Sequence, residues 1–256
     1  MDDEFAQYPS LRDRVVFITG GATGIGAELV RQFASQGSLV TFVDIDEPAA
    51  SRLTEEINAK GWPTVAFSHC DVRDVEALRT AIERVGRQAG PVTVLVNNAA
   101  NDERHGFETV TVGYWDDRLQ VNLRHHFFAI QSVVPMMRRA GGGSIINIGS
   151  VSWHAGFGGL PGYTASKAAI EGLTRSIARD LGPDKIRVTC VIPGWIMTER
   201  QLALWLTEEA ERDLMRAQCL KQKLVPADVA RLVLWLAAHD SLMCTRQNWV
   251  VDGGWI

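Results

Sequence analysis

The sequence predicts an α/β fold: a single doubly wound parallel sheet of about seven strands, flanked by helices on both faces. Short apolar, β-branched runs recur along the 256 residues and alternate with segments of helical periodicity, which is the pattern of βαβ units. The runs are continuously apolar, as expected for strands that are covered on both faces. A glycine-rich turn joins the first run to the first helical segment.

The elements follow one another in a regular order. The predicted strands comprise residues 15–19, 39–43, 64–67, 92–96, 145–148, 186–192 and 249–251. Asp74 is the predicted N-cap of a helix with apolar residues on one face, and Pro226 opens another helix at a first-turn position. No linker, low-complexity tract or internal repeat interrupts the pattern, so residues 1–256 are predicted to form one domain.

The composition excludes several classes of function. The formal net charge is −4, and no basic run suggests a nucleic acid or an anionic membrane surface as a partner. No apolar stretch approaches the ~20 residues of a membrane span. The acidic start MDDEFAQYPS is unlike a signal or transit peptide, so we expect a cytoplasmic protein.

Metal binding is not expected. The four cysteines are scattered without a CxxC pair, which predicts reduced core thiols. His125 and His126 are adjacent on a predicted helix and are expected to point to different faces.

The turn TGGATGIG, residues 19–26, is typical of a phosphate site between a strand and a helix. Gly20, Gly24 and Gly26 have the spacing GxxxGxG rather than the commoner GxGxxG. The first glycine allows a tight turn, the middle one lets a pyrophosphate approach, and the last lets the helix pack on the sheet. Free N–H groups and the positive helix end attract the anion. Packing alone is the alternative reason for such a turn.

Asp44 indicates which dinucleotide binds. It ends the second strand, where a carboxylate can accept hydrogen bonds from an adenosine ribose and would repel a 2′-phosphate. The glycine loop offers no basic residue. NAD is therefore predicted rather than NADP, and a turn or helix-cap role for Asp44 is the alternative.

The segment YTASKAAIEGL suggests catalysis. It places Tyr163 and Lys167 four residues apart, on one face of a predicted helix. Ser150 follows the strand SIINIG, thirteen residues before Tyr163. Asn122 lies on the apolar side of its predicted helix, where a buried amide needs hydrogen-bond partners.

Together these motifs resemble the classical short-chain dehydrogenase/reductase family. The resemblance covers most of the chain and includes TGGATGIG, Asp44, CDV at 70–72, NNAA at 97–100, Asn122, Ser150, YTASK at 163–167 and IPGWIMT at 192–198. It implies a single Rossmann-type domain, a nicotinamide cofactor, oxidoreductase activity and a homo-oligomer, with a homotetramer expected.

The resemblance also implies roles by position. Tyr163 would be the general base of oxidation, with a pKa lowered by Lys167 and the nicotinamide ring. Lys167 would also bind the nicotinamide ribose, Ser150 would hold the substrate oxygen, and Asn122 would help to hold a water and a proton route. The implied cofactor set is Gly20, Thr23, Gly24, Ile25, Gly26, Asp44, Asp71, Val72, Asn98, Ala99, Ala100, Tyr163, Lys167, Pro193, Ile196 and Thr198. Ala100 departs from the family's more usual glycine by one methyl group.

Polar groups and flat aromatic surfaces are expected at the substrate. The predicted substrate residues are Asn101, Ser150, Trp153, His154, Tyr163, Trp195 and Arg200. Such a mixture suits a sugar better than a fatty or steroid substrate. Solvation or pairing at the surface is the alternative for the charged residues. Residues 195–223 are expected to cover the substrate as a lid.

Longer motifs, among them YWDDRLQVNLRH and SVSWH, look like those of bacterial NAD-dependent aldose 1-dehydrogenases, the D-xylose type above all. This resemblance implies oxidation of a cyclic aldose at C1 to the aldonolactone. D-Xylose, D-galactose, L-arabinose and a 6-deoxyhexose are the candidate sugars. The alternatives are another oxidoreductase of the family, acting on a sugar acid or a 3-oxoacyl substrate, and an inactive NAD-binding regulator.

Overall fold

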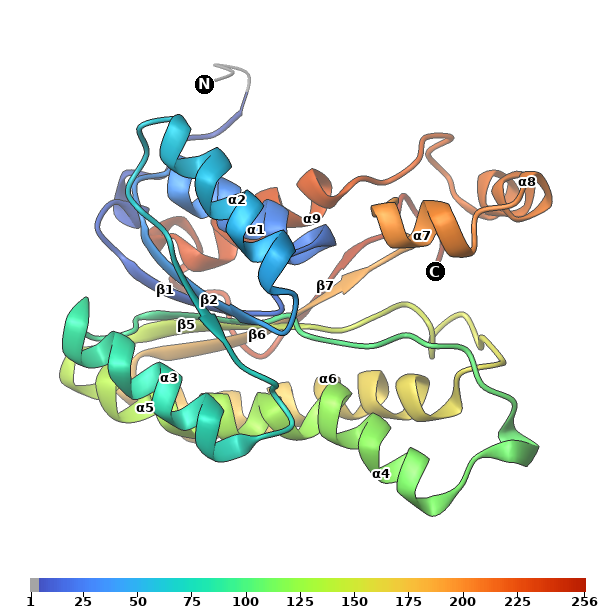
Figure 1. The fold of residues 1–256 in the computed structure, drawn as a ribbon, viewed down its shortest axis with the longest axis horizontal. Helices are drawn as coiled ribbons and strands as arrows, with labels where there is room; N and C mark the ends of the chain where they lie inside the picture. The colour runs from blue at the N-terminus through green and yellow to red at the C-terminus, as the bar shows by residue number, and fades with distance from the viewer. Residues whose placement is uncertain (1–4) are drawn as a thin grey trace.

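A seven-stranded parallel sheet forms the centre of the protein. The computed structural model describes residues 5–256 (Figure 1) and orders the strands β3-β2-β1-β4-β5-β6-β7, which confirms the predicted fold class. The strands are β1 Val15–Thr19, β2 Leu39–Asp44, β3 Ala66–His69, β4 Val94–Asn97, β5 Gly143–Ile148, β6 Ile186–Pro193 and β7 Asn248–Val251. The prediction that the acidic start is not a signal or transit peptide depends partly on residues 2–4, which lie outside the described residues.

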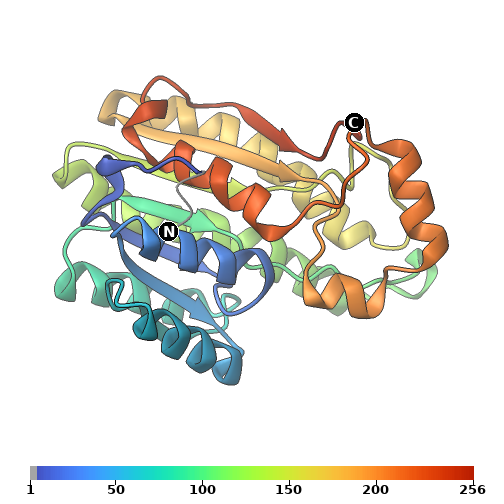
Figure 2. The same cartoon turned by 90° about the horizontal axis from the view of Figure 1, so that it is seen from above.

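Helices cover both faces of the sheet (Figures 1 and 2). One face carries α1 Gly24–Ser35, α2 Glu47–Ala59 and α9 Pro226–Ala237, and the other carries α3 Val75–Gln88, α5 His125–Arg139 and α6 Pro161–Leu181. Side chains of β1 alternate between two cores: Val16 and Ile18 pack with α1 and α9, whereas Phe17 packs with α3 and α5. Burial of both faces explains why the strands read as continuous apolar runs.

Three short helices lie beyond the carboxyl ends of the strands. Helix α4, Val112–Leu119, runs through a π-helical turn, Gln120–Arg124, into α5, and α7, Glu199–Leu204, and α8, Glu208–Ala217, follow β6. The chain runs from β1 outward to β3 and then returns to β4 on the other side of β1. The strand order therefore reverses between β1 and β4, with β2 and β3 on one side and β5 to β7 on the other. The carboxyl ends of β1 and β4 border the crevice where such sheets bind ligands.

The local predictions hold with small shifts. Asp74 caps α3 by accepting from the Ala77 amide at 3.0 Å, and Pro226 is the first residue of α9. Strands β3 and β4 each begin two residues later than predicted, because the buried Val65 and Val92 precede the paired segments. An apolar side chain can be buried before its backbone joins the ladder.

The cysteine prediction is partly wrong. Cys70 and Cys190 are buried, but Cys219 is exposed and Cys244 is partly exposed. Cys219 lies in the connecting segment after α8, outside both cores. Within residues 5–256, no helix combines the length and apolarity that a membrane crossing needs.

Candidate active site

A cavity of about 640 Å³ opens at the carboxyl ends of the central strands. Its walls come from the loops after β4, β5 and β6 and from the helices α6, α7 and α8. Eight of the predicted cofactor residues line it, namely Ile25, Asn98, Ala100, Tyr163, Lys167, Pro193, Ile196 and Thr198. The cavity therefore brings half of the predicted cofactor residues together with residues of α7 and α8.

The glycine loop is folded as a close cradle. Gly20 and Gly24 have φ values of +67° and +55°, a region that L side chains rarely adopt. A Cβ on Gly20 would lie 2.7 Å from the Cα of Ala99, and one on Gly26 would lie 1.8 Å from the Gly20 carbonyl oxygen. Thr23 is the N-cap of α1, whose first amides have no intrahelical acceptor. At Gly20 and Gly26 the close contacts are with the protein itself, so these two glycines allow the loop to pack against Ala99 and against its own backbone.

Asp44 lies at the end of β2 and supports this loop. Its Oδ2 accepts from the Ala22 amide at 2.9 Å, and its Oδ1 accepts from the amides of Ile45 and Asp46 at 2.7 and 3.1 Å. The turn role that was the alternative for Asp44 is therefore present. It does not exclude ribose binding, because a carboxylate has more lone pairs than these three bonds use.

The other nucleotide-side residues are held by local bonds. The Asn98 side-chain amide donates to the Thr19 and Gly20 carbonyl oxygens at 3.2 and 2.7 Å. Asp71 is paired with Arg73 at 2.6 Å, and this ion pair lowers the pKa of the Asp71 carboxyl. Val72 is buried beside it. Asp71, Val72 and Ala99 lie outside the cavity wall.

Ser150, Tyr163 and Lys167 meet at the cavity wall. Ser150 lies just after β5, and its hydroxyl oxygen accepts from the Ser152 amide at 3.1 Å, which leaves its own proton to donate. Tyr163 lies in the first turn of α6, and Lys167 is one turn further along the same face. The Lys167 ammonium donates to the Ile148 carbonyl oxygen at 2.7 Å, on the buried side of the cavity.

Burial dominates the acid–base behaviour of this pair. Desolvation raises the pKa of Tyr163 to about 12, against a lowering by the hydrogen bond with Ser150. Desolvation also lowers the pKa of Lys167 to about 8. In the protein alone, loss of hydration outweighs the nearby donors. The lowering of the Tyr163 pKa expected from Lys167 together with a nicotinamide ring stays a prediction.

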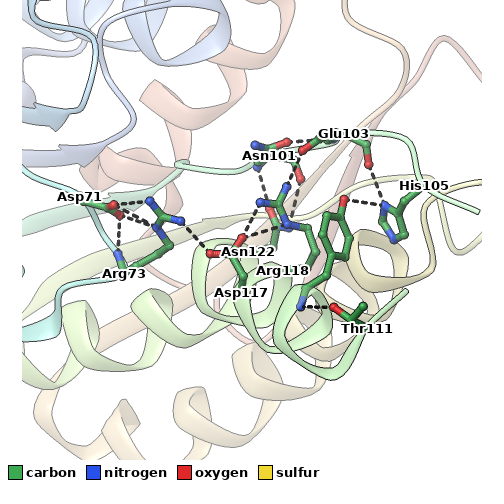
Figure 3. Close-up of polar contacts among 10 residues, drawn as sticks. Asp71, Arg73, Asn101, Glu103, His105, Thr111, Asp117, Arg118 and Asn122 are labelled. Carbon is green, nitrogen blue, oxygen red and sulfur yellow. Dashed lines mark hydrogen bonds and ion pairs between the residues drawn. The ribbon is translucent and has the colours of Figure 1, made fainter. Parts of the chain in front are cut away.

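Asn122 stands behind the cavity in the π-helical turn. It is fully buried, its Oδ1 accepts from the Asn101 amide at 2.7 Å, and its Nδ2 donates to the Asn101 carbonyl oxygen at 3.1 Å (Figure 3). The predicted need for amide partners is thus met by the loop after β4. The bonds fix the start of that loop beside the crevice.

Comparison with known proteins identifies the family. A family model described as enoyl-(acyl carrier protein) reductase matches residues 20–256. A double mutant of a short-chain dehydrogenase/reductase from Serratia marcescens superposes with a TM-score of 0.88 at 33% identity, covering 96% of this chain and 99% of that chain. The chain belongs to the short-chain dehydrogenase/reductase family.

Relatives within this family include sugar enzymes. The "D-xylose 1-dehydrogenase" of Caulobacter vibrioides is 48% identical over 250 residues, which are 98% of either chain. The "Probable galactose dehydrogenase GalD" of Rhizobium meliloti is 47% identical over 249 residues, 97% of either chain. A solved blue fluorescent protein from a metagenomic library, in complex with NADPH, has a TM-score of 0.86 at 36% identity, covering 96% and 99% of the two chains. The matches establish a nicotinamide-dependent family without distinguishing NAD from NADP.

Two predicted substrate residues are misplaced. Trp153 and His154 do not line the cavity of this family member. Instead, both side chains contact Glu171 on α6: Trp153 Nε1 lies 2.6 Å from Glu171 Oε1, and His154 Nε2 lies 2.8 Å from the same oxygen. The turn after Val151 folds back onto α6, so these side chains are directed to the helix instead of the cavity.

Two further predicted substrate residues lie outside the cavity wall. Neither Asn101 nor Arg200 lines the cavity. The Asn101 side chain accepts from the Glu103 amide at 2.9 Å, and Arg200 pairs with Asp102 at 3.2 Å with its side chain half-exposed. The surface pairing considered for Arg200 is therefore what the structure shows.

Trp195 does line the cavity, together with residues that the sequence did not single out as substrate ligands. Its indole N–H donates to Gln201 Oε1 at 2.8 Å, and the Gln201 amide donates to Asp102 Oδ2 at 2.6 Å. This chain ties α7 to the loop after β4. Arg104, Ser152, Phe157, Asp213 and Trp255 also line the wall. Arg104 comes from the loop after β4 and Asp213 from α8, whereas Trp255 reaches the wall from the C-terminal segment by a tertiary contact.

The adjacent histidines do not point to different faces. Both are fully buried, with ring centroids 4.4 Å apart. His125 Nε2 lies 3.0 Å from the Ala99 carbonyl oxygen, and His126 Nδ1 lies 3.2 Å from Asn147 Oδ1. Neighbouring residues differ by about 100° around a helix, and the buried stripe of α5 is wide enough to hold both.

Proposed function

We propose that the protein is an NAD-dependent sugar dehydrogenase that oxidises the C1 hydroxyl of a cyclic aldose to the aldonolactone. The observation that carries the proposal is the cavity itself, whose wall includes Ser150, Tyr163 and Lys167 together with Asp102 and Gln201. Hydroxyl-rich substrates need such hydrogen-bonding groups beside the reacting carbon. The near-full-length relatives named for D-xylose and galactose support the same substrate class.

The residues of the crevice fit a dinucleotide. The first amides of α1 follow the glycine loop, and Thr23 makes no side-chain cap, so these N–H groups are the proposed site for a pyrophosphate. We propose that Asp44, Asp71, Val72 and Asn98 hold the adenosine half. Ile196, Thr198 and Lys167 would hold the nicotinamide half. The Asp44 carboxylate favours NAD over NADP, because a 2′-phosphate would meet its negative charge.

The proposed roles at the reacting carbon follow from proton positions. The Ser150 hydroxyl, already accepting from the Ser152 amide, donates to the C1 oxygen of the sugar. Tyr163 removes the C1 hydroxyl proton as general base. Lys167 stabilises the phenolate electrostatically. When bound, the nicotinamide ring accepts the hydride that leaves C1. The carbon is thereby oxidised from hemiacetal to lactone, and the lactone then hydrolyses in water.

The quaternary structure and location belong to the proposal as well. The homotetramer rests on the family resemblance, and the cytoplasmic location rests on the four cysteines, which have no CxxC pair and form no disulfide. Size-exclusion chromatography with light scattering measures the assembly, and a tetramer of this 28.2 kDa chain is expected.

The direct test is NAD⁺ reduction by the purified protein, followed by absorbance against aldopentoses, aldohexoses and 6-deoxyhexoses, with NADP⁺ in parallel. Simple alcohols, sugar acids and a 3-oxoacyl substrate with NADH serve as controls. Turnover with one group of aldoses supports the proposal. Turnover restricted to a sugar acid or an oxoacyl substrate replaces it with another activity of the family, and NAD binding without any turnover favours a regulator.

A further inference from the structure

The catalytic helix α6 receives its N-terminal cap from a distant loop. Leu160 is the N-cap residue and its side chain makes no capping hydrogen bond, while Pro161 has no N–H to donate. Gly162 therefore supplies the first amide of the helix, which has no intrahelical acceptor. This amide donates to Nε2 of His105 at 3.2 Å, from 57 residues earlier in the chain.

The surroundings of His105 fix which ring nitrogen accepts. Its Nδ1 lies 2.9 Å from the Glu103 carbonyl oxygen and 3.1 Å from the Tyr114 hydroxyl (Figure 3). A carbonyl oxygen can only accept, so Nδ1 carries the proton in this arrangement and Nε2 has the free lone pair. The neutral ring with its proton on Nδ1 is thus the tautomer that matches the Gly162 amide.

Close packing keeps the two segments in register. A Cβ on Gly162 would lie 3.0 Å from Cβ of Arg118 and 3.6 Å from His105 Nε2, so a larger residue there would require Arg118 to shift. Arg118 is buried and pairs with Asp117 and Glu103. A backbone bond from the His105 amide to the Gly159 carbonyl oxygen, at 2.7 Å, adds a second tie.

We propose that His105 is a positioning residue, whose Nε2 caps the first turn of α6 and so fixes Tyr163 against Ser150. Tyr163 follows Gly162 directly, and displacement of a reacting group by about 1 Å can cost as much as 10²-fold in rate. His105 takes no part in proton transfer. The proposal depends on Tyr163 as the base and not on which sugar is bound.

The test compares His105→Ala, which removes the acceptor, with His105→Gln, whose amide oxygen can replace Nε2. His239→Ala, at an exposed histidine beside Arg14, is the matched control. Hydrogen exchange of peptides spanning residues 160–166 should be about fivefold faster in His105→Ala. The kcat should fall about tenfold with an unchanged KM for NAD⁺. His105→Gln should recover both, and His239→Ala should match the wild type.

Circular dichroism and cofactor binding establish that each variant is folded. Wild-type exchange and kcat in His105→Ala would overturn the proposal, and so would equal losses in the Ala and Gln variants when both are folded. The exchange measurement needs no substrate. A silent sugar panel would therefore refute the proposed substrate without affecting the test of the cap.

Discussion

The Lys167 ammonium donates a hydrogen bond to the carbonyl oxygen of Ile148 at 2.7 Å, and this bond ties helix α6 to the end of β5, the strand that precedes Ser150. Both groups are buried, so the ammonium lacks water and relies on such partners. The same bond sets how far α6 can move from β5. The relative position of Ser150 and Lys167 is therefore a property of the protein before any ligand binds.

Replacement of Tyr163 by Phe should reduce kcat by about 10²–10⁴-fold, because the general base is lost. NAD⁺ affinity should stay within about threefold of wild type, since the ring still packs at the cavity wall. Stopped-flow turnover and a fluorescence titration with NADH measure the two quantities. Full turnover in this variant would refute Tyr163 as base.

In the wild type, kcat/KM should rise with pH, because a base with a raised pKa must first be ionised.

Replacement of Asp44 by Ala should relax the discrimination against NADP⁺ by about tenfold or more, because a negatively charged carboxylate no longer faces the 2′-phosphate. NAD⁺ binding should also weaken, because the Ala22 amide loses its acceptor. Asp44→Asn is the matched control, which removes the charge but keeps an acceptor for that amide. If the ratio of kcat/KM for NAD⁺ and NADP⁺ stays unchanged in both variants, Asp44 does not select the cofactor.

Replacement of Gln201 by Leu should raise the KM for the sugar by about tenfold, with a smaller effect on the KM for NAD⁺. The side chain bridges Trp195 and Asp102, so its loss frees α7 from the loop after β4. Arg200→Gln is the control, because its ion pair with Asp102 is half-exposed and such pairs contribute little. Steady-state kinetics with both substrates checks this, and an unchanged sugar KM in Gln201→Leu would exclude α7 as a substrate-side lid.

The buried histidines should make the fold sensitive to acid. Burial lowers the pKa of His125 to about 3 and shifts the pKa of His126 in the same direction. The unfolded chain, with a histidine pKa of about 6.5, binds more protons below that pH. The free energy of unfolding is therefore undiminished above about pH 6.5 and falls towards pH 3, with a loss of about 2 kcal/mol at pH 5 from His125 alone.

Urea unfolding at pH 7.5 and pH 5.0 measures this loss. His125→Asn, which keeps a donor for the Ala99 carbonyl oxygen, should show a smaller decrease between the two pH values. An equal decrease in the free energy of unfolding in wild type and variant would mean that protonation of His125 does not contribute to the loss of stability in acid.

Motif spacing predicted the parts of the site that sit on regular elements. Periodicity places Tyr163 and Lys167 on one helix face, and the family resemblance implied that Ser150, at a strand end, belongs to the same site. Trp153 and His154 could not be placed in this way. Their direction depends on a turn that folds back to Glu171, which lies on α6 two turns beyond Tyr163. Trp255 likewise could not be placed from the sequence. Its ring packs on that of Phe157, with the ring centroids 5.2 Å apart, and the two residues are far apart in sequence.

The central claim is oxidation at the anomeric carbon, and isotopic transfer tests it most directly. The purified protein would turn over an aldose deuterated at C1 with NAD⁺, and mass spectrometry would read the reduced cofactor. The account predicts NADH that carries the deuterium and a lactone or aldonic acid that has lost it. Reduced cofactor without deuterium, beside a sugar oxidised at another carbon, would contradict it.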